Sequence, residues 1–153
     1  MEIAKMDSMK MGETNNDYTL QFWVSGVEVD INEAPAFFSL IDPQDNIKLA
    51  LFRDPREPSS INTVVNSALI NTTMNELDWH DSNEFYLISI LFSDNLGLKG
   101  YVDSTIFLDE ADHLVIVGDT KLMIGTKANE ERTILENFWH GYMNEIRLWN
   151  TWL

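Results

Sequence analysis

The sequence predicts an all-β fold in which two antiparallel sheets pack as a sandwich. Short runs of aromatic and β-branched residues recur about every ten residues, with turn signals between them. Helical periodicity is weak everywhere except over residues 129–138. We find no internal repeat and no low-complexity linker, and 153 residues suit one domain. Together these observations favour a single β-sandwich over an α/β fold.

The first clear strand is predicted at residues 18–24, where Leu20, Phe22 and Val24 share one face at a period of two. Residues 1–17 are expected to form a ragged N-terminal strand or a lead-in to the domain. Turn signals that include proline bound the segments that follow. Further strands are expected at 36–41, 47–52 and 61–73, the last of which is one strand or two.

The strongest strand signal covers residues 85–92, which are apolar on both faces, as in a central strand of a sandwich. A turn at 94–97 then predicts a hairpin with 98–103. The polar segment 127–136 is expected to be a loop, with or without one helical turn. Shorter strands are expected at 106–108, 114–117 and 122–125, and the last strand at 142–149.

The last strand is predicted to contain a β-bulge. Met143 lies at odd parity, whereas Ile146 and Leu148 lie at even parity. All three face the core only if an extra residue is inserted near Asn144-Glu145. Gly141 is expected to supply the turn into this strand.

Composition excludes several functional classes. The chain has 25 acidic and 10 basic residues and a formal net charge of −15, so a basic nucleic-acid footprint is absent. The acidic field favours divalent cations or cationic partners. With no cysteine, a disulfide scaffold, a thiolate zinc site and a cysteine nucleophile are excluded. We predict no transmembrane helix, and the start lacks the apolar stretch of a signal peptide.

Three stretches, taken in order, resemble the laminin G-like domains of the concanavalin A-like lectin/glucanase jelly-roll superfamily. Residues 18–24, YTLQFWV, resemble the early aromatic strand of that family. Residues 85–92 followed by 98–104 resemble its W-x-H-V-A-V-x-F and L-x-L-Y-V-D-G motifs. Residues 139–150, WHGYMNEIRLWN, resemble its closing F-x-G-x-I-x-E-V-R-I-Y-N. The resemblance implies one jelly-roll domain over residues 18–153.

The sequence departs from these motifs at three positions. Phe85 stands where the family has Trp, and Leu87 where it has His. Ser104 stands where the family has Gly, which weakens the expected turn because Gly tolerates positive φ more readily than Ser.

The resemblance implies a non-catalytic recognition or adhesion module that binds a glycan or a protein partner outside the cell or at a particle surface. The alternative is a structural subunit of a filament, shell or larger surface assembly. The methionine-rich start, the absence of a signal peptide and the end at Trp152-Leu153 suit that alternative. Fold alone does not decide between them.

A third hypothesis comes from Glu28, Asp30 and Glu33, an E-x-D-x-x-E string that resembles the catalytic motif of retaining β-glucanases. Retaining hydrolysis needs two carboxylates close together. The resemblance to this motif implies that Glu28 is the nucleophile, Asp30 the modulator and Glu33 the acid/base. The alternative is a row of solvated carboxylates in an acidic chain.

The resemblance also implies a calcium ion at the rim, held by acidic side chains and backbone carbonyls. Asp45, in the turn before the strand at 47–52, is the best candidate ligand. A second ligand is expected from residues 129–131, in the loop before the closing strand. A solvated turn without calcium is the alternative.

For glycan recognition the sequence favours Trp79, an aromatic residue in a polar segment, with Trp152 second. Trp79 equally suits a cap on the end of the sandwich. Trp23 and Trp149 lie in predicted strands and are expected in the core. Asn71 begins the N-T-T sequon, a glycosylation candidate if the chain is secreted.

Overall fold

A computed structural model of the chain describes residues 2–5, 17–28, 35–44, 46–54, 56–93, 96–111, 120–125, 127–128, 135–136, 139–149 and 151–152. Every regular element in these ranges is a β-strand. In this part of the chain no helix is long and apolar enough to cross a membrane. The predicted strand at 114–117 lies outside the described residues.

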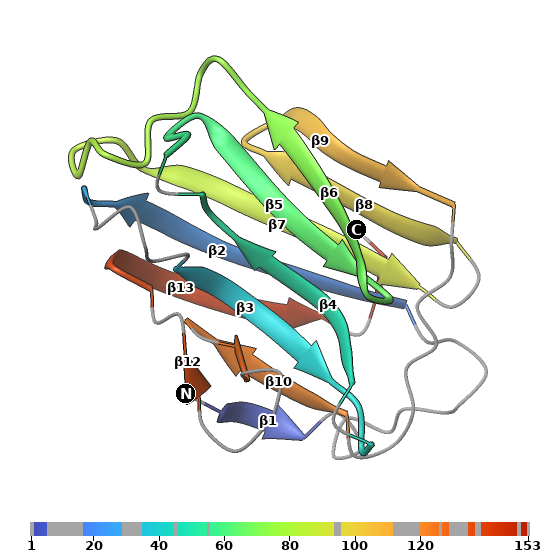
Figure 1. Ribbon diagram of the computed structural model, residues 1–153. Coiled ribbons are helices and arrows are strands. Elements are labelled where there is room, and N and C mark those ends of the chain that lie inside the picture. The colour runs from blue at the N-terminus through green and yellow to red at the C-terminus, as the bar shows by residue number, and fades with distance from the viewer. Residues whose placement is uncertain are drawn as a thin grey trace.

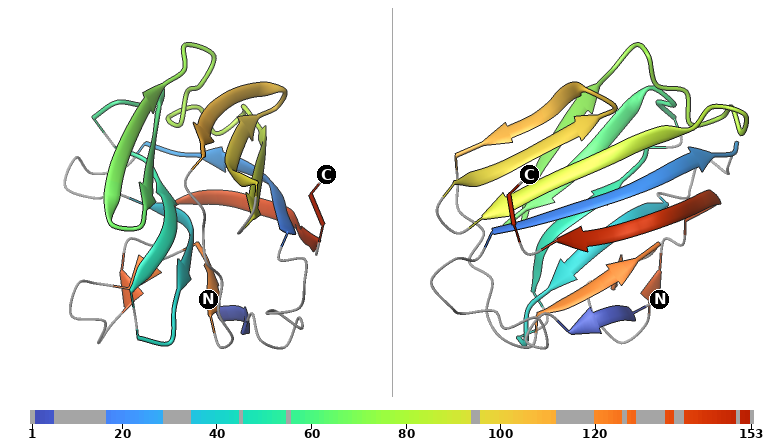
Figure 2. Two further views of the ribbon diagram at one scale, coloured as in Figure 1. Left: turned by 90° about the vertical axis from the view of Figure 1, so that its right-hand side faces the viewer. Right: turned by 180° about the vertical axis from the view of Figure 1, so that it is seen from behind.

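Eleven of the thirteen described strands form two antiparallel sheets that face one another, the two-sheet jelly-roll sandwich that the sequence predicts (Figures 1 and 2). The six-stranded sheet has the order β1-β10-β3-β4-β5-β6, and the five-stranded sheet has the order β13-β2-β7-β8-β9. The first comprises β1 (Glu2–Lys5), β10 (Lys121–Ile124), β3 (Ala36–Ile41), β4 (Ile47–Phe52), β5 (Ser60–Val65) and β6 (Ala68–Thr73). The second comprises β13 (Gly141–Trp149), β2 (Asp17–Gly26), β7 (Tyr86–Ser93), β8 (Gly97–Val102) and β9 (Thr105–Glu110).

Most of the predicted strands are confirmed, the segment 61–73 contains two strands and not one, and the expected loop at 127–136 is corrected. The segment 61–73 is a hairpin, because Asn66 and Ser67 take positive φ values of 47° and 72° and form its two-residue turn. The polar segment 127–136 is not wholly a loop, since β11 (Lys127–Ala128) pairs with β12 (Leu135–Glu136). At the β8–β9 turn the positive φ is carried by Asp103, at 53°, so position 104 does not need glycine.

The core lies between the two sheets. Leu20, Phe22 and Val24 of β2 point into it and are at most 1% exposed, as their spacing predicts. The bulge in β13 is also confirmed, since its register against β2 shifts between Asn144 and Arg147. Met143, Ile146 and Leu148 consequently all pack against the core.

An aromatic cluster closes one end of the sandwich. Phe37 stacks on Trp139 with ring centroids 4.1 Å apart, and Trp79 lies 5.0 Å from Phe37 and 5.2 Å from Tyr86. The Trp79 indole N–H donates a hydrogen bond to the Ser60 carbonyl at 2.8 Å, so its one polar atom is satisfied.

Arg53 connects two segments of the chain at this end of the sandwich. It is fully buried, and its Nη1 donates hydrogen bonds to the carbonyls of Val27 at 2.7 Å and Trp79 at 3.1 Å. Burial lowers the pKa of Arg53 to about 10, although nearby Asp78 acts in the opposite direction. Gly26 is required beside this contact, because a Cβ there would lie 2.2 Å from the Trp79 carbonyl oxygen.

We therefore predict that Arg53→Ala lowers the free energy of unfolding by about 3 kcal/mol, since it opens a cavity and leaves two carbonyls without a donor. Urea denaturation measures the effect. Arg56→Ala, at an exposed position of the adjacent loop, is the matched control and should change stability by less than about 0.5 kcal/mol. Equal losses in the two variants would contradict this role for Arg53.

Candidate ligand-binding site

The outward face of the five-stranded sheet carries the candidate site, and strand alternation decides which side chains it contains. Because Leu20, Phe22 and Val24 point into the core, the intervening side chains of β2 point away from it. Cross-strand register then aligns outward residues of neighbouring strands in rows. One row runs Arg147, Gln21, Ser89 and Tyr101, and the next runs Trp149, Thr19, Leu91 and Lys99.

The larger of two hollows on this face has a volume of about 340 Å³. Its floor is polar and ordered, because Gln21 Nε2 donates a hydrogen bond to Ser89 Oγ at 2.8 Å. The chain after β13 lies beside it, since Thr19 Oγ1 donates to the Thr151 carbonyl at 2.7 Å. The lining residues are Thr19, Gln21, Ser89, Leu91, Lys99, Tyr101, Asp103 and Trp152.

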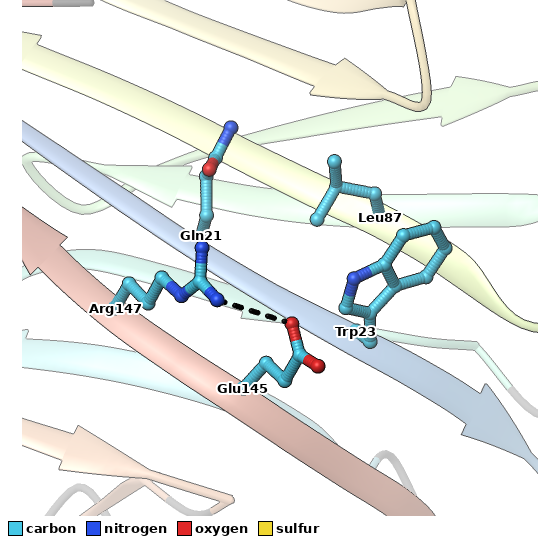
Figure 3. Close-up of a pocket in the computed structure, with 5 residues that line it drawn as sticks. All are labelled: Gln21, Trp23, Leu87, Glu145 and Arg147. Carbon is cyan, nitrogen blue, oxygen red and sulfur yellow. Dashed lines mark hydrogen bonds and ion pairs between the residues drawn. The ribbon is translucent and has the colours of Figure 1, made fainter.

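A smaller hollow of about 90 Å³ adjoins the first and shares Gln21 with it. Figure 3 shows the Trp23 indole beside Leu87, with Glu145 and Arg147 reaching in from β13. Arg147 Nη2 lies 3.3 Å from Glu145 Oε2 in an exposed ion pair. We call the two hollows together the sheet trough.

Most charged groups of the sheet trough already form an ion pair or a hydrogen bond within the protein. Glu145 and Arg147 pair with each other, and the Asp103 carboxylate accepts a hydrogen bond from the Leu87 N–H at 3.0 Å. Lys99, which is half-buried, makes no ion pair within the described part of the chain. An ordered floor with aromatic rings and a few polar groups can bind a ligand that has both apolar faces and hydroxyls.

Trp79 does not fit the predicted role as an exposed aromatic platform. Its side chain is 0% exposed and forms part of the aromatic cluster, so no ring face is open to a ligand. The alternative, a cap on the end of the sandwich, is what the structure contains. A polar sequence neighbourhood misleads here, because the loop that contains Trp79 folds its indole inward while its charged neighbours face solvent.

Trp23 is a second correction, since it is half-buried on the outward face and not in the core. The signal was present in the sequence, because the parity that puts Phe22 and Val24 inward puts Trp23 outward. Trp149 is likewise half-buried, in the outward row with Thr19. Of the aromatic residues that the sequence suggested for glycans, only Trp152 lines the sheet trough.

The E-x-D-x-x-E string falls largely outside the described residues. Glu28 is exposed just after β2, and Asp30 and Glu33 are not among the described residues. Asn71 is exposed on β6, and its Nδ2 lies 2.5 Å from Asn62 Oδ1. Neither Glu28 nor Asn71 lines the sheet trough.

The turn between β3 and β4 gives no calcium site from its described residues. Asp45, the predicted ligand, lies outside them. Asp42 is buried, and its carboxylate accepts hydrogen bonds from Asn46 N at 2.8 Å and Asn46 Nδ2 at 3.3 Å. Lys48 Nζ lies 3.7 Å away. Across the described residues, no three His, Asp or Glu side chains are grouped to hold a metal ion.

No protein-family model matches the chain, and no curated protein matches its sequence. Solved structures do match. The native heptameric SAP-like pentraxin from Limulus polyphemus aligns with a TM-score of 0.69 and 13% identity, over 91% of this chain and 66% of the pentraxin chain. The CBM40 of the Ruminococcus gnavus IT-sialidase, solved bound to α2,3-sialyllactose, aligns with a TM-score of 0.65 and 11% identity, over 100% of this chain and 90% of that one.

A Trypanosoma rangeli sialidase aligns with a TM-score of 0.66 and 18% identity, over 90% of this chain but only 21% of the sialidase. This chain thus spans about two thirds of the pentraxin and a fifth of the sialidase. At such identities the likeness concerns the fold alone. These comparisons support the two-sheet jelly-roll fold, while the resemblance to laminin G-like domains stays a prediction.

The Asp42 turn generates a prediction on pH dependence. Burial acts to raise the pKa of Asp42, but the hydrogen bonds from Asn46 and the nearby Lys48 outweigh it, so its pKa in the fold is lowered. The stabilisation is therefore present above the pKa of the unfolded chain, about 3.9, and is lost as pH falls through the lower folded value. Asp42→Asn should cost about 1–2 kcal/mol at pH 7.

Urea denaturation of the native chain and of Asp42→Asn, repeated from neutral to acid pH, measures the gap between their free energies of unfolding. We expect the gap to narrow as pH falls below about 4. A gap that stays constant over the same range would mean that the Asp42 charge does not stabilise the turn.

Proposed function

We propose that this chain is a non-catalytic recognition module that binds a glycan in the sheet trough. The observation that carries the proposal is the larger hollow, where Tyr101 and Trp152 stand beside Gln21, Ser89 and Lys99. A sugar ring has apolar C–H faces that pack on aromatic rings and hydroxyls that need hydrogen-bond partners. The trough offers both on strands whose positions the core fixes.

The polar groups of the trough supply the hydrogen bonds, and the aromatic rings supply the apolar contacts. While its Nε2 donates to Ser89 Oγ, the side-chain carbonyl oxygen of Gln21 can accept a hydrogen bond from a sugar hydroxyl. Lys99 supplies up to three donors to ring or hydroxyl oxygens. The hydrogen bond between Gln21 and Ser89 orders the floor before a ligand arrives, which lowers the entropy lost on binding.

The fold supports a binding role but does not supply the ligand. The R. gnavus module, which has a similar fold, was solved with sialyllactose, and this chain spans 90% of its length. A protein partner on the same face is the second form of the proposal. A location outside the cell or at a particle surface belongs to the proposal as well, because glycan ligands are displayed there.

Calcium remains a separate proposal that rests on Asp45. The described carboxylates of the trough do not cluster, since Glu145 pairs with Arg147 and Asp103 bonds to the Leu87 N–H. Glycan binding in the trough should therefore be the same with calcium and with a chelator. Loss of binding on chelation would instead indicate a calcium site that the ligand shares.

The test is a glycan array followed by calorimetry on the glycans that bind. We expect Trp152→Ala and Tyr101→Ala each to weaken binding about tenfold, because each removes a ring contact of roughly 1–1.5 kcal/mol. Phe85→Ala is the matched control, since Phe85 is exposed and aromatic but does not line the trough. Its affinity should equal that of the native chain.

Two outcomes would contradict the proposal. One is the absence of binding to any glycan on the array. The other is an equal loss of affinity in Phe85→Ala and Trp152→Ala, which would place the binding surface elsewhere. Thermal unfolding of each variant checks that the fold is intact.

A further inference from the structure

The two main sheets have four edge strands, and three of them carry features that block pairing with another strand. Edge strands expose unpaired backbone groups, and charges, bulges and short length protect them. β1 has four residues and a register shift after Glu2. β13 contains the bulge with Glu145 and Arg147, and β9 ends in Asp109 and Glu110 beside a register shift in its pairing with β8.

β6 is the edge without such protection. Its six residues, ALINTT, contain no charge and no proline, and it pairs with β5 in unbroken register. Leu69 is 63% exposed at this edge. Within the described residues no strand pairs with the outer side of β6, which lies at the margin of the sheet in Figure 1.

The sequence on both sides of β6 is uncharged as well. Residues 58–75 contain no charged side chain, although the chain as a whole has 25 acidic and 10 basic residues. This stretch covers β5, β6 and the turn between them. In a chain with a net charge of −15, pairing of two such stretches sets no charged side chain of one β6 opposite a charged side chain of the other.

The hairpin turn decides which backbone groups of β6 are free. Val65 and Ala68 flank the two-residue turn and pair with each other. Backbone groups then alternate along the strand, so those of Ile70 and Thr72 point to β5. Those of Leu69, Asn71 and Thr73 point outward from the sheet.

We propose that β6 is a homodimer interface, in which β6 of one copy pairs antiparallel with β6 of a second copy to extend the six-stranded sheet across a two-fold axis. The free groups of Leu69, Asn71 and Thr73 match this arrangement. With Asn71 opposite Asn71 of the second copy, each Leu69 lies opposite a Thr73 and the outward faces coincide.

A second copy fits this edge better than an unrelated strand for a physical reason. Self-pairing places neutral residues against neutral residues on both sides, and it satisfies the free backbone groups of both copies at once. One six-residue ladder buries little surface, so the dimer should depend on concentration. Asn71 is also the sequon asparagine, and a glycan attached there would block the pairing sterically.

Analytical ultracentrifugation of unglycosylated protein from bacterial expression tests the proposal. We expect the mass to rise from that of a monomer to that of a dimer with protein concentration. Added salt should favour the dimer, because it screens the repulsion between two acidic chains.

Asn71→Lys should remain a monomer at concentrations where the native chain dimerises, since it sets like charges opposite each other at the two-fold axis. Tyr142→Lys is the matched control, because Tyr142 is 64% exposed on β13, at the far edge of the other sheet, and it should dimerise like the native chain. A native chain that stays a monomer at its highest soluble concentration would overturn the proposal. Dimers of Asn71→Lys as stable as native dimers would do so as well.

Discussion

The alternation of side chains along β2 is the constraint on which both faces of the five-stranded sheet depend. Leu20, Phe22 and Val24 are essentially inaccessible to solvent, and their burial sets the register of β2 between β13 and β7. A slip by one residue would exchange the core face and the outward face. The same burial that stabilises the fold therefore holds Gln21 and Trp23 in the sheet trough.

Much of this fold could be predicted from sequence because its determinants are local. Period two in β2, apolar residues on both faces of β7 and turn signals place the strands. The bulge was predictable too, since Met143 and Ile146 can share the core face only if one residue is added. The hairpin within 61–73 stayed ambiguous, because its turn uses Asn66-Ser67 and has no glycine.

The candidate site was harder to predict because it depends on contacts between distant segments. Trp79 lies in a polar stretch of the sequence, yet its carbonyl accepts a hydrogen bond from Arg53 and its indole packs on other aromatic rings in the core. The trough assembles from β2, β7, β8, β13 and Trp152, and no single motif contains it. Strand parity alone indicated Trp23, but an apolar tryptophan in a strand more often lies in the core.

The most direct test of glycan binding in the trough is an NMR titration with a glycan that binds. The indole N–H signals of the five tryptophans are monitored during this titration. The signal of Trp152 should shift, because its ring lines the larger hollow. The signal of Trp79 should stay in place, because its indole is buried and bonded to the Ser60 carbonyl. Shifts confined to Trp79, with Trp152 unmoved, would contradict the account and place the ligand near the aromatic cluster instead.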